Sequence, residues 1–268
     1  MINILKRKVK KNSVRNVYHC CIQKSGSQWI KRVLSDPIIK KKNLKVYTPG
    51  KDFIYHPKDF KFSSLNFPLN SIVSPLYINY ENFLAIPKPG NYKAFWVMRD
   101  PRDLVISRYF SMKYSHDIIN ESIKKERDFL NQVSEEEGLN YFIEAIAKKH
   151  AKLYAVLRSW LKSVENPGIM IGKFEDLIGT NQLESFKRIF DHCEISIPNS
   201  TLKGLLEKYS FEKLANGRKQ GEADSKSHYR KGISGDWQNY FNENHKKLFK
   251  QAAGNLLVEL GYEKNDNW

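Results

Sequence analysis

The chain has 268 residues and a mass of 31.4 kDa, which is enough for one sizeable hydrophobic core. A hydrophobic content of 41% and an aromatic content of 13% are typical of a globular protein and exclude an intrinsically disordered one. The sequence has no apolar run long enough for a transmembrane helix. The three cysteines are too few for a disulfide framework, and residues 1–13 form a basic extension without the apolar region of a secretory signal. We therefore expect a reduced, cytoplasmic protein without a membrane span.

The formal net charge of +16 favours an anionic partner. Nucleic acid, acidic lipid, a nucleotide cosubstrate and an acidic protein all fit such a charge. A solvated, lysine-rich surface without any partner fits it equally well. Charge alone therefore selects no function.

Strand-like and helix-like segments alternate along the chain. In chain order, the expected elements are a strand at 14–22, a helix at 27–35, short strands at 44–48, 52–55 and 71–78, a strand at 92–98, a helix at 101–114 with Asp100 as N-cap, helical spacing at 140–162, a strand at 168–177 that ends in a turn, helices at 183–191 and 200–215, a polar stretch at 216–237, and a last helix with Leu248, Ala252, Leu256 and Leu260 at i+4 spacing. This alternation predicts a single α/β domain with a mainly parallel central sheet flanked by helices. Ligands of such sheets bind beyond the carboxyl ends of the strands, where Lys24 and Arg99 are both expected.

Three segments carry charged or hydroxyl side chains suited to an anion. In the first, QKSGSQW, a predicted strand leads through Gly26 directly into a helix, so free backbone N–H groups, Lys24, Ser25 and Ser27 converge. The segment is not a Walker A motif, because its lysine precedes the glycine. Read alone, it is either an anion site or an ordinary strand-to-helix turn.

The second segment is WVMRDPRDLVISRYF. Arg99 at the strand end can bind a phosphate through two parallel hydrogen bonds, and Ser107 lies about two helical turns further on. The alternative is an Arg–Asp network that caps the helix. We favour that network for Arg102 and Asp103, and a ligand for Arg99.

The third segment, HYRKGISGDWQNYF, places Arg230 and Lys231 beside Gly232, where a backbone without a side chain can approach a phosphate closely. A solvated loop is the alternative. The three segments in this order and separation are much less easily explained by chance than any one alone.

Together the three segments resemble the soluble sulfotransferases that use 3'-phosphoadenosine 5'-phosphosulfate (PAPS). The family's K-S-G-T-T-W loop is matched by Lys24-Ser25-Gly26-Ser27-Gln28-Trp29, its R-[DN]-P-R-D-x-x-x-S element by the segment from Arg99 to Ser107, and its R-K-G-x-x-G-D-W element by residues 230–237. Weaker matches are GKFEDL to a Y-E-D-L turn and YSFEKL to a T-S-F segment. The resemblance spans about residues 17–262 and implies a P-loop-kinase-like fold, with residues 14–268 as the sulfotransferase domain.

The resemblance also implies the roles of the residues. The 5'-phosphosulfate would lie on the Lys24 loop, and the 3'-phosphate on Arg99, Ser107 and the Arg230-Lys231-Gly232 turn. Trp29 and Phe211 would line the base pocket. The expected reaction is in-line transfer of the sulfuryl group to a hydroxyl or amine, with 3'-phosphoadenosine 5'-phosphate (PAP) leaving and Lys24 stabilising the leaving oxygen. No metal is expected, since no metal-ligand spacing occurs.

The resemblance does not identify the general base, because the histidine that serves this role in the family has no counterpart in this sequence. Many members have a histidine in a K-T-H-L-P stretch before the second motif, whereas the corresponding stretch here, NSIVSPLYINYENF, has none. His116 is our prediction for the base, with His56, Glu81 and Tyr77 as alternatives. Gln28 stands where the family often has threonine, a change that leaves the backbone donors in place.

The acceptor stays open at this stage: a small molecule, a glycan or a carrier-bound group. Residues 48–90 and 111–140 are expected to supply its pocket. The aromatic group Phe53, Tyr55, Phe60, Phe62 and Phe67 either lines that pocket or packs the core, and we favour packing. Two other functions are possible from the sequence. A P-loop kinase or NTPase is disfavoured because no G-K-[ST] follows the loop, and a nucleic-acid-binding protein is supported only by the net charge.

Overall fold

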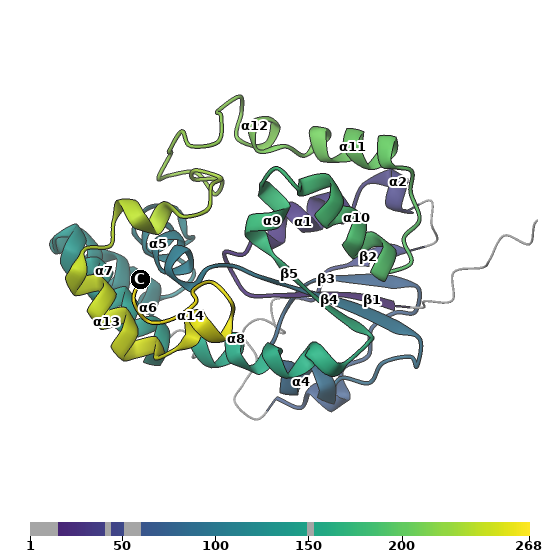
Figure 1. Ribbon diagram of the computed structural model, residues 1–268, viewed down its shortest axis with the longest axis horizontal. Helices are drawn as coiled ribbons and strands as arrows, with labels where there is room; N and C mark the ends of the chain where they lie inside the picture. The colour runs from purple at the N-terminus through teal and green to yellow at the C-terminus, as the bar shows by residue number, and fades with distance from the viewer. Residues whose placement is uncertain (1–15, 41–43, 51–59, 149–152) are drawn as a thin grey trace, which may run out of the picture.

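A five-stranded parallel sheet forms the centre of the molecule (Figure 1). The computed structural model describes residues 16–40, 44–50, 60–148 and 153–268. Its strands are β1 (Asn16–Cys21), β2 (Lys45–Tyr47), β3 (Ser71–Tyr77), β4 (Tyr92–Met98) and β5 (Ile169–Lys173), in the order β2-β3-β1-β4-β5. Every neighbouring pair is parallel. The predicted α/β class is therefore confirmed.

Helices cover both faces of this sheet. They are α1 (Ser27–Leu34), α2 (Pro37–Lys40), α4 (Tyr80–Ala85), α5 (Pro101–Phe110), α6 (Glu121–Gln132), α7 (Glu135–Lys148), α8 (Leu153–Leu161), α9 (Phe174–Ile178), α10 (Gln182–His192), α11 (Asn199–Lys208), α12 (Phe211–Leu214), α13 (Glu243–Ala253) and α14 (Leu256–Glu259). Short turns are η1 (Phe62–Ser64), the π-helical η2 (Ser111–Ser115), η3 (Lys162–Glu165) and η4 (Asp236–Asn239). In Figure 1, α1, α9 and α10 lie on one side of the sheet, and α4 and α8 on the other.

Each face of the sheet has its own hydrophobic core, because alternate residues of a strand point to opposite faces. Val17 of β1 joins the core beneath α1, α10 and α11. Its neighbour Tyr18 joins the larger core beneath α4, α5, α7 and α8. The two cores fix the sheet between helical layers and so fix where the strand ends lie.

Several predicted elements differ from those observed. The last helix is not continuous, because Gly254 adopts a φ of 59° and separates α13 from α14, although Leu256 and Leu260 are buried as the spacing predicts. The helix predicted at 200–215 is likewise two helices, since Ser210 caps α12. The region 111–140, for which no helix was predicted beyond residue 114, is mostly helical. The strand expected at 52–55, and with it Phe53, Tyr55 and His56, lies outside the described residues.

The register brings the functional segments to one edge of the sheet. Cys21 of β1 pairs with Tyr77 of β3 and with Val97 of β4, and Met98 pairs with Lys173 of β5. The residues that follow these strands therefore emerge side by side. This is the edge at which a parallel sheet binds ligands.

Candidate active site

The loop between β1 and α1 is shaped by two residues with left-handed backbone. Lys24 has a φ of 72° and Gly26 a φ of 76°, which is unusual for a lysine. A Cβ added at Gly26 would lie 2.7 Å from the Phe174 ring. Only glycine therefore fits there, and the turn directs the first N–H groups of α1 toward the space above the strand ends.

Arg99 ties this loop to two other segments. Its Nη1 donates to the Lys24 carbonyl at 3.0 Å, its Nη2 donates to the Ile233 carbonyl at 3.2 Å, and its guanidinium lies 4.7 Å from the centre of the Phe174 ring. Nε is buried and has no hydrogen-bond partner among the atoms of the described chain. Arg99 thus connects the first and third motifs, while its Nε–H group donates no hydrogen bond within the described chain.

The turn that carries Arg230 and Lys231 is organised by Asp236. This buried carboxylate accepts hydrogen bonds from Arg230, from Lys231 Nζ at 2.6 Å and from Asn239 at 2.9 Å. Burial alone would raise the pKa of Asp236, but these hydrogen bonds outweigh it and lower that pKa. Gly232 has a φ of 70°, and any Cβ there would overlap the Phe211 ring. The turn therefore places its glycine against an aromatic ring, next to two cations.

Asp103 of α5 connects the second and third motifs. Its carboxylate accepts from the backbone N–H of Gly235 at 2.8 Å and of Trp237 at 2.9 Å, and it lies 3.7 Å from Arg99. Burial raises its pKa despite these partners. Arg102 donates two parallel hydrogen bonds to Asp100, from Nε to Oδ1 at 3.0 Å and from Nη2 to Oδ2 at 2.7 Å, and also donates to Glu263. The capping network predicted for Arg102 and Asp103 is confirmed.

Asp103→Ala is expected to lower the free energy of unfolding by about 2–4 kcal/mol, because it leaves two backbone N–H groups without their acceptor and Arg99 without its counter-charge. Urea unfolding measures the loss. Glu144→Ala is the matched control, since it removes a carboxylate from an exposed i,i+4 pair with Lys148 and should change stability by less than about 0.5 kcal/mol. Equal effects of the two substitutions would contradict this role of Asp103.

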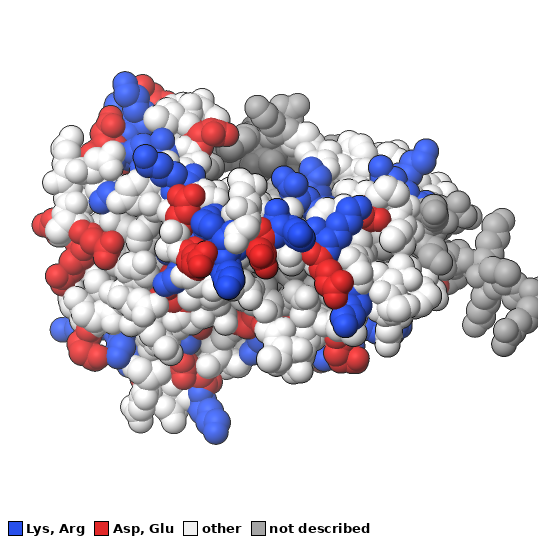
Figure 2. All heavy atoms as spheres, turned by 90° about the horizontal axis from the view of Figure 1, so that it is seen from above, with Lys and Arg blue, Asp and Glu red and all other residues white. Residues whose placement is uncertain are grey.

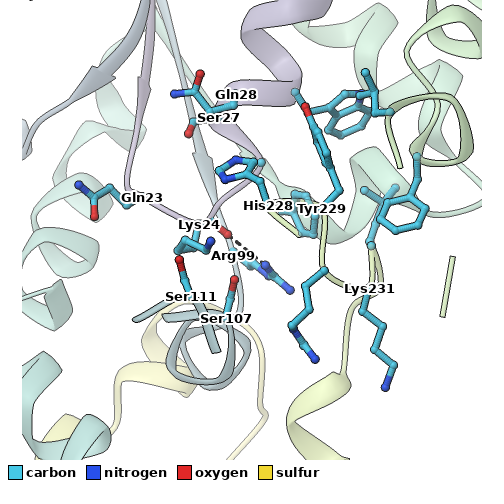
Figure 3. A pocket seen from close by; sticks show the side chains of 18 of the residues that line it. Gln23, Lys24, Ser27, Gln28, Arg99, Ser107, Ser111, His228, Tyr229 and Lys231 are labelled. Atoms are coloured by element: carbon cyan, nitrogen blue, oxygen red, sulfur yellow. Dashed lines mark hydrogen bonds between the residues drawn. The ribbon is translucent and has the colours of Figure 1, made fainter. Parts of the chain in front are cut away.

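One cavity of about 430 Å³ collects nearly all of the predicted site residues (Figure 3). A volume of this order is ordinary for small-molecule sites. The predicted residues that line it are Lys24, Gly26, Ser27, Gln28, Trp29, Arg99, Ser107, His116, Phe211, Arg230, Lys231 and Gly232. Ser25 does not, because its buried hydroxyl donates to the Ile22 carbonyl at 2.8 Å and so holds the loop from behind.

Positive charge is concentrated around Lys24. Burial, and then the charges of Arg99, Arg108 and Arg230, lower the pKa of Lys24 to about 8. These cations repel one another, and the repulsion is stronger where water is largely excluded. A multiply charged anion in the cavity relieves that repulsion, so the arrangement is suited to phosphate or sulfate groups.

The candidates for the general base differ in position. His116 lines the cavity, and burial together with the charge of Lys24 lowers its pKa. Tyr77 also lines it, but burial raises the pKa of its phenol to about 12, and its oxygen is hydrogen-bonded to Ser27 at 2.8 Å and Gln28 at 3.1 Å. Glu81 lies elsewhere, in an exposed pair with Lys162. A protonated phenol accepts no proton at neutral pH, so His116 is better suited than Tyr77.

Several cavity residues were missed by sequence reasoning. Phe174 follows β5 at the same sheet edge, and Ser111 follows Ser107 by one helical turn, so strand ends and helical spacing could have indicated both. His228 precedes Arg230 by two residues and projects into the cavity near the Lys24 loop (Figure 3). No local pattern distinguishes this histidine from an ordinary loop residue.

The aromatic group considered for the acceptor pocket is represented among the described residues by Phe60, Phe62 and Phe67. Phe62 and Phe67 are buried in the core, and Phe60 packs against it. None of the three lines the cavity. Core packing, the interpretation favoured from the sequence, is confirmed for them.

Comparison with known proteins identifies this arrangement as that of a group-transfer enzyme. The family model described as "Sulfotransferase domain" matches residues 16–261, and the chain belongs to this family. It is a sulfotransferase, as the resemblance of its motifs predicted. The kinase and nucleic-acid-binding alternatives are not favoured.

Relatives share the sequence over most of its length. Flavonol 3-sulfotransferase from Flaveria bidentis is 25% identical over 252 residues, which span 85% of this chain and 77% of that protein. Sulfotransferase 6B1 from Danio rerio is 27% identical over 180 residues, which span 64% of this chain and 56% of that protein. The solved structure of mouse sulfotransferase SULT7A1 complexed with PAP matches with a TM-score of 0.63 and 17% identity over 92% of this chain and 85% of that one. This last likeness supports the P-loop-like fold.

The distribution of charge on the surface tests whether the net charge of +16 forms a basic area for an anionic partner. Figure 2 shows Lys and Arg side by side with Asp and Glu over the face viewed there, without a continuous basic area. Over the described ranges, no helix combines the length and the apolar character needed to cross a bilayer. The concentration of cations described above lies instead within the cavity.

Proposed function

We propose that the chain transfers a sulfuryl group from PAPS to a hydroxyl acceptor, with PAP as the leaving product. The observation that carries this proposal is the cation cluster of Lys24, Arg99, Arg230 and Lys231 in a cavity that also holds aromatic rings. Such a cavity suits a ligand with phosphates at two positions and a planar base. PAP in complexes of SULT7A1 and of retinol dehydratase agrees with it.

Each motif then has a separate role. The N–H groups of the β1–α1 loop and Lys24 bind the 5'-phosphosulfate, while Arg99, Ser107, Arg230 and Lys231 bind the 3'-phosphate. Trp29 is held by a hydrogen bond from its Nε1 to the Tyr209 carbonyl at 2.8 Å, and Phe211 lies against Gly232. Both rings line the cavity and provide the walls for adenine.

In the chemical step, His116 takes the proton from the acceptor hydroxyl while that oxygen bonds to sulfur. The bond between sulfur and the 5'-phosphate oxygen breaks, and the electron pair stays on that oxygen. Lys24 stabilises the charge that develops there. The imidazole proton returns to water when the products leave.

Titration calorimetry with PAP, adenosine 5'-monophosphate and ATP with magnesium tests the donor. Tight binding of PAP and weak binding of the other two is the expected result. Preference for magnesium-ATP, or no binding of PAP, would contradict the proposal. The cytoplasmic location and the domain boundary at residue 14 stay predictions.

PAP binding is expected to take up protons above neutral pH. In the free protein the pKa of Lys24 is about 8, so at pH 8.5 much of this lysine is neutral. A bound phosphate raises that pKa, so each PAP takes up on the order of 0.5 proton and affinity falls as pH rises past 8. Calorimetry in buffers of different ionisation enthalpy measures the uptake. Lys24→Arg is the control, because its guanidinium does not titrate; the same uptake in that variant would rule out Lys24 as the source.

His116→Gln is expected to lower turnover by about 10²–10³-fold and to leave PAP affinity unchanged. In the wild type, turnover should fall below the lowered pKa of His116, since a protonated imidazole accepts no proton. Tyr77→Phe is the matched variant at the other candidate base and should lower turnover by less than about tenfold. Rates of PAP release across pH 5–8 measure both. A larger loss in Tyr77→Phe than in His116→Gln would reverse the assignment.

A further inference from the structure

Part of the cavity wall consists of side chains that can hydrogen-bond. The apolar rings lie with the nucleotide motifs: Phe174 touches Gly26 and Arg99, and Phe211 touches Gly232. Ile178 and Leu214 line the cavity from the same helices as these rings, α9 and α12, and Gln182, Gln220, His228 and Tyr229 line it as well. A second wall is made by Gln23, Tyr77, Ser111, Ser115, His116 and Asp117. In Figure 3, Gln23 lies on the other side of Lys24 from Tyr229 and Lys231, and Ser111 lies beside Lys24.

This second wall, which we call the polar wall, lies outside the nucleotide motifs and is the part that we assign to the acceptor. Each of its six members has a side chain that can hydrogen-bond, and none is aliphatic. Ile118 and Ile119, the large apolar side chains that follow Asp117, are exposed and do not line the cavity. The apolar lining of the cavity, which includes Phe174, Ile178, Phe211 and Leu214, belongs to other segments, so the polar wall is the more polar part of a site of ordinary composition.

The polar wall is held in place by α6. Arg127 donates from Nε to the Met112 carbonyl at 2.8 Å and from Nη2 to the His116 carbonyl, which fixes the π-helical turn and the chain after it. Such turns recur at functional sites. Gln23 and Asp117 are exposed, so this end of the cavity opens to solvent and leaves room for an acceptor that extends beyond it.

We propose that the acceptor is a carbohydrate hydroxyl, an assignment that rests on the proposed function. A sugar offers a hydroxyl to each polar group of the wall, whereas a flat apolar acceptor leaves those groups without partners. A protonated amine is disfavoured beside the cations Lys24, Arg99 and Arg230. The inference separates this chain from a relative such as flavonol 3-sulfotransferase, whose name specifies a flavonol.

An acceptor panel tests the inference. The protein is incubated with PAPS and cellobiose, lactose, N,N'-diacetylchitobiose, 2-naphthol, the flavonol quercetin or the amine tyramine, and sulfated products are quantified by mass spectrometry. At least one disaccharide is expected to give a kcat/KM about tenfold or more above those of the three non-carbohydrates. Higher kcat/KM for a non-carbohydrate, or no carbohydrate product from protein that binds PAP in calorimetry, overturns the inference. Failure to bind PAP is a failure of the proposed function itself and is detected separately.

Variants of the polar wall identify the groups responsible. Gln23→Leu and Ser115→Ala are each expected to raise the KM for the disaccharide about tenfold, with the Kd for PAP within about twofold of wild type. Gln23→Leu should also improve turnover of 2-naphthol. Lys162→Ala, in an exposed pair remote from the cavity, is the control and should alter neither constant. Unchanged KM in both wall variants would contradict recognition by this wall.

Discussion

Lys24→Ala is expected to lower turnover by about 10²–10³-fold while changing the Kd for PAP by less than about tenfold. In the proposed site the ammonium group lies where charge develops on the leaving oxygen, so we expect its contribution to be larger in the transition state than in the bound ground state. Burial first, and then repulsion from neighbouring arginines, lowers the pKa of this lysine to about 8. Removing the cation relieves that repulsion, which offsets part of the lost attraction for the phosphate. PAP release from PAPS measures turnover, and calorimetry measures affinity.

Lys162→Ala is the matched control for charge, because it removes an exposed lysine far from the cavity. It should leave turnover and affinity within about twofold of wild type. A loss of Kd as large as the loss of kcat in Lys24→Ala would assign this lysine to ground-state binding, contrary to the role proposed.

Arg230→Ala should show the opposite pattern, with the Kd for PAP raised about 10- to 100-fold and kcat nearly unchanged at saturating PAPS. The proposed partner of Arg230 is the 3'-phosphate, which is remote from the transferring group. In the free protein Arg230 is bound to Asp236 and stacks 4.5 Å from the centre of the Phe110 ring. The phosphate must therefore share this cation with a buried carboxylate.

Lys231 and Asn239 continue to satisfy Asp236 in the Arg230→Ala variant, so the turn should keep its shape. Thermal unfolding without ligand checks this and should give a Tm close to that of wild type. Lys187→Ala, which removes a cation from a pair on α10, is the control. A reduced kcat with an unchanged Kd would place Arg230 near the reacting sulfur and reverse its role with that of Lys24.

The positions of the charged residues that follow the strands were predictable, because they depend on local sequence patterns. A buried apolar run followed by a glycine or by Asp-Pro locates the end of a strand and the start of a helix. Lys24 and Arg99 follow β1 and β4, which are neighbours in the sheet, and the hydrogen bond from Arg99 to the Lys24 carbonyl shows that the two meet.

Other features depend on contacts between distant segments and were not predictable. The hydroxyl of Ser25 does not line the cavity, because it donates a hydrogen bond to the Ile22 carbonyl. Asp103, predicted only as part of a helix cap, also binds the backbone of Gly235 and Trp237, more than 130 positions later in the chain. A partner at that separation leaves no periodic signal.

The sequence by itself determined the family, the parallel α/β fold and most of the residues assigned to the nucleotide. Those residues stand in three short motifs whose spacing reflects local backbone geometry. The sequence also indicated two regions, 48–90 and 111–140, for the acceptor pocket, but only the tertiary structure decided which of their side chains line the cavity beside Gln23: Tyr77 and the turn from Ser111 to Asp117. Their meeting depends on how β1, β3 and the end of α5 are packed, because a shared wall is built from long-range contacts that no single stretch of sequence encodes.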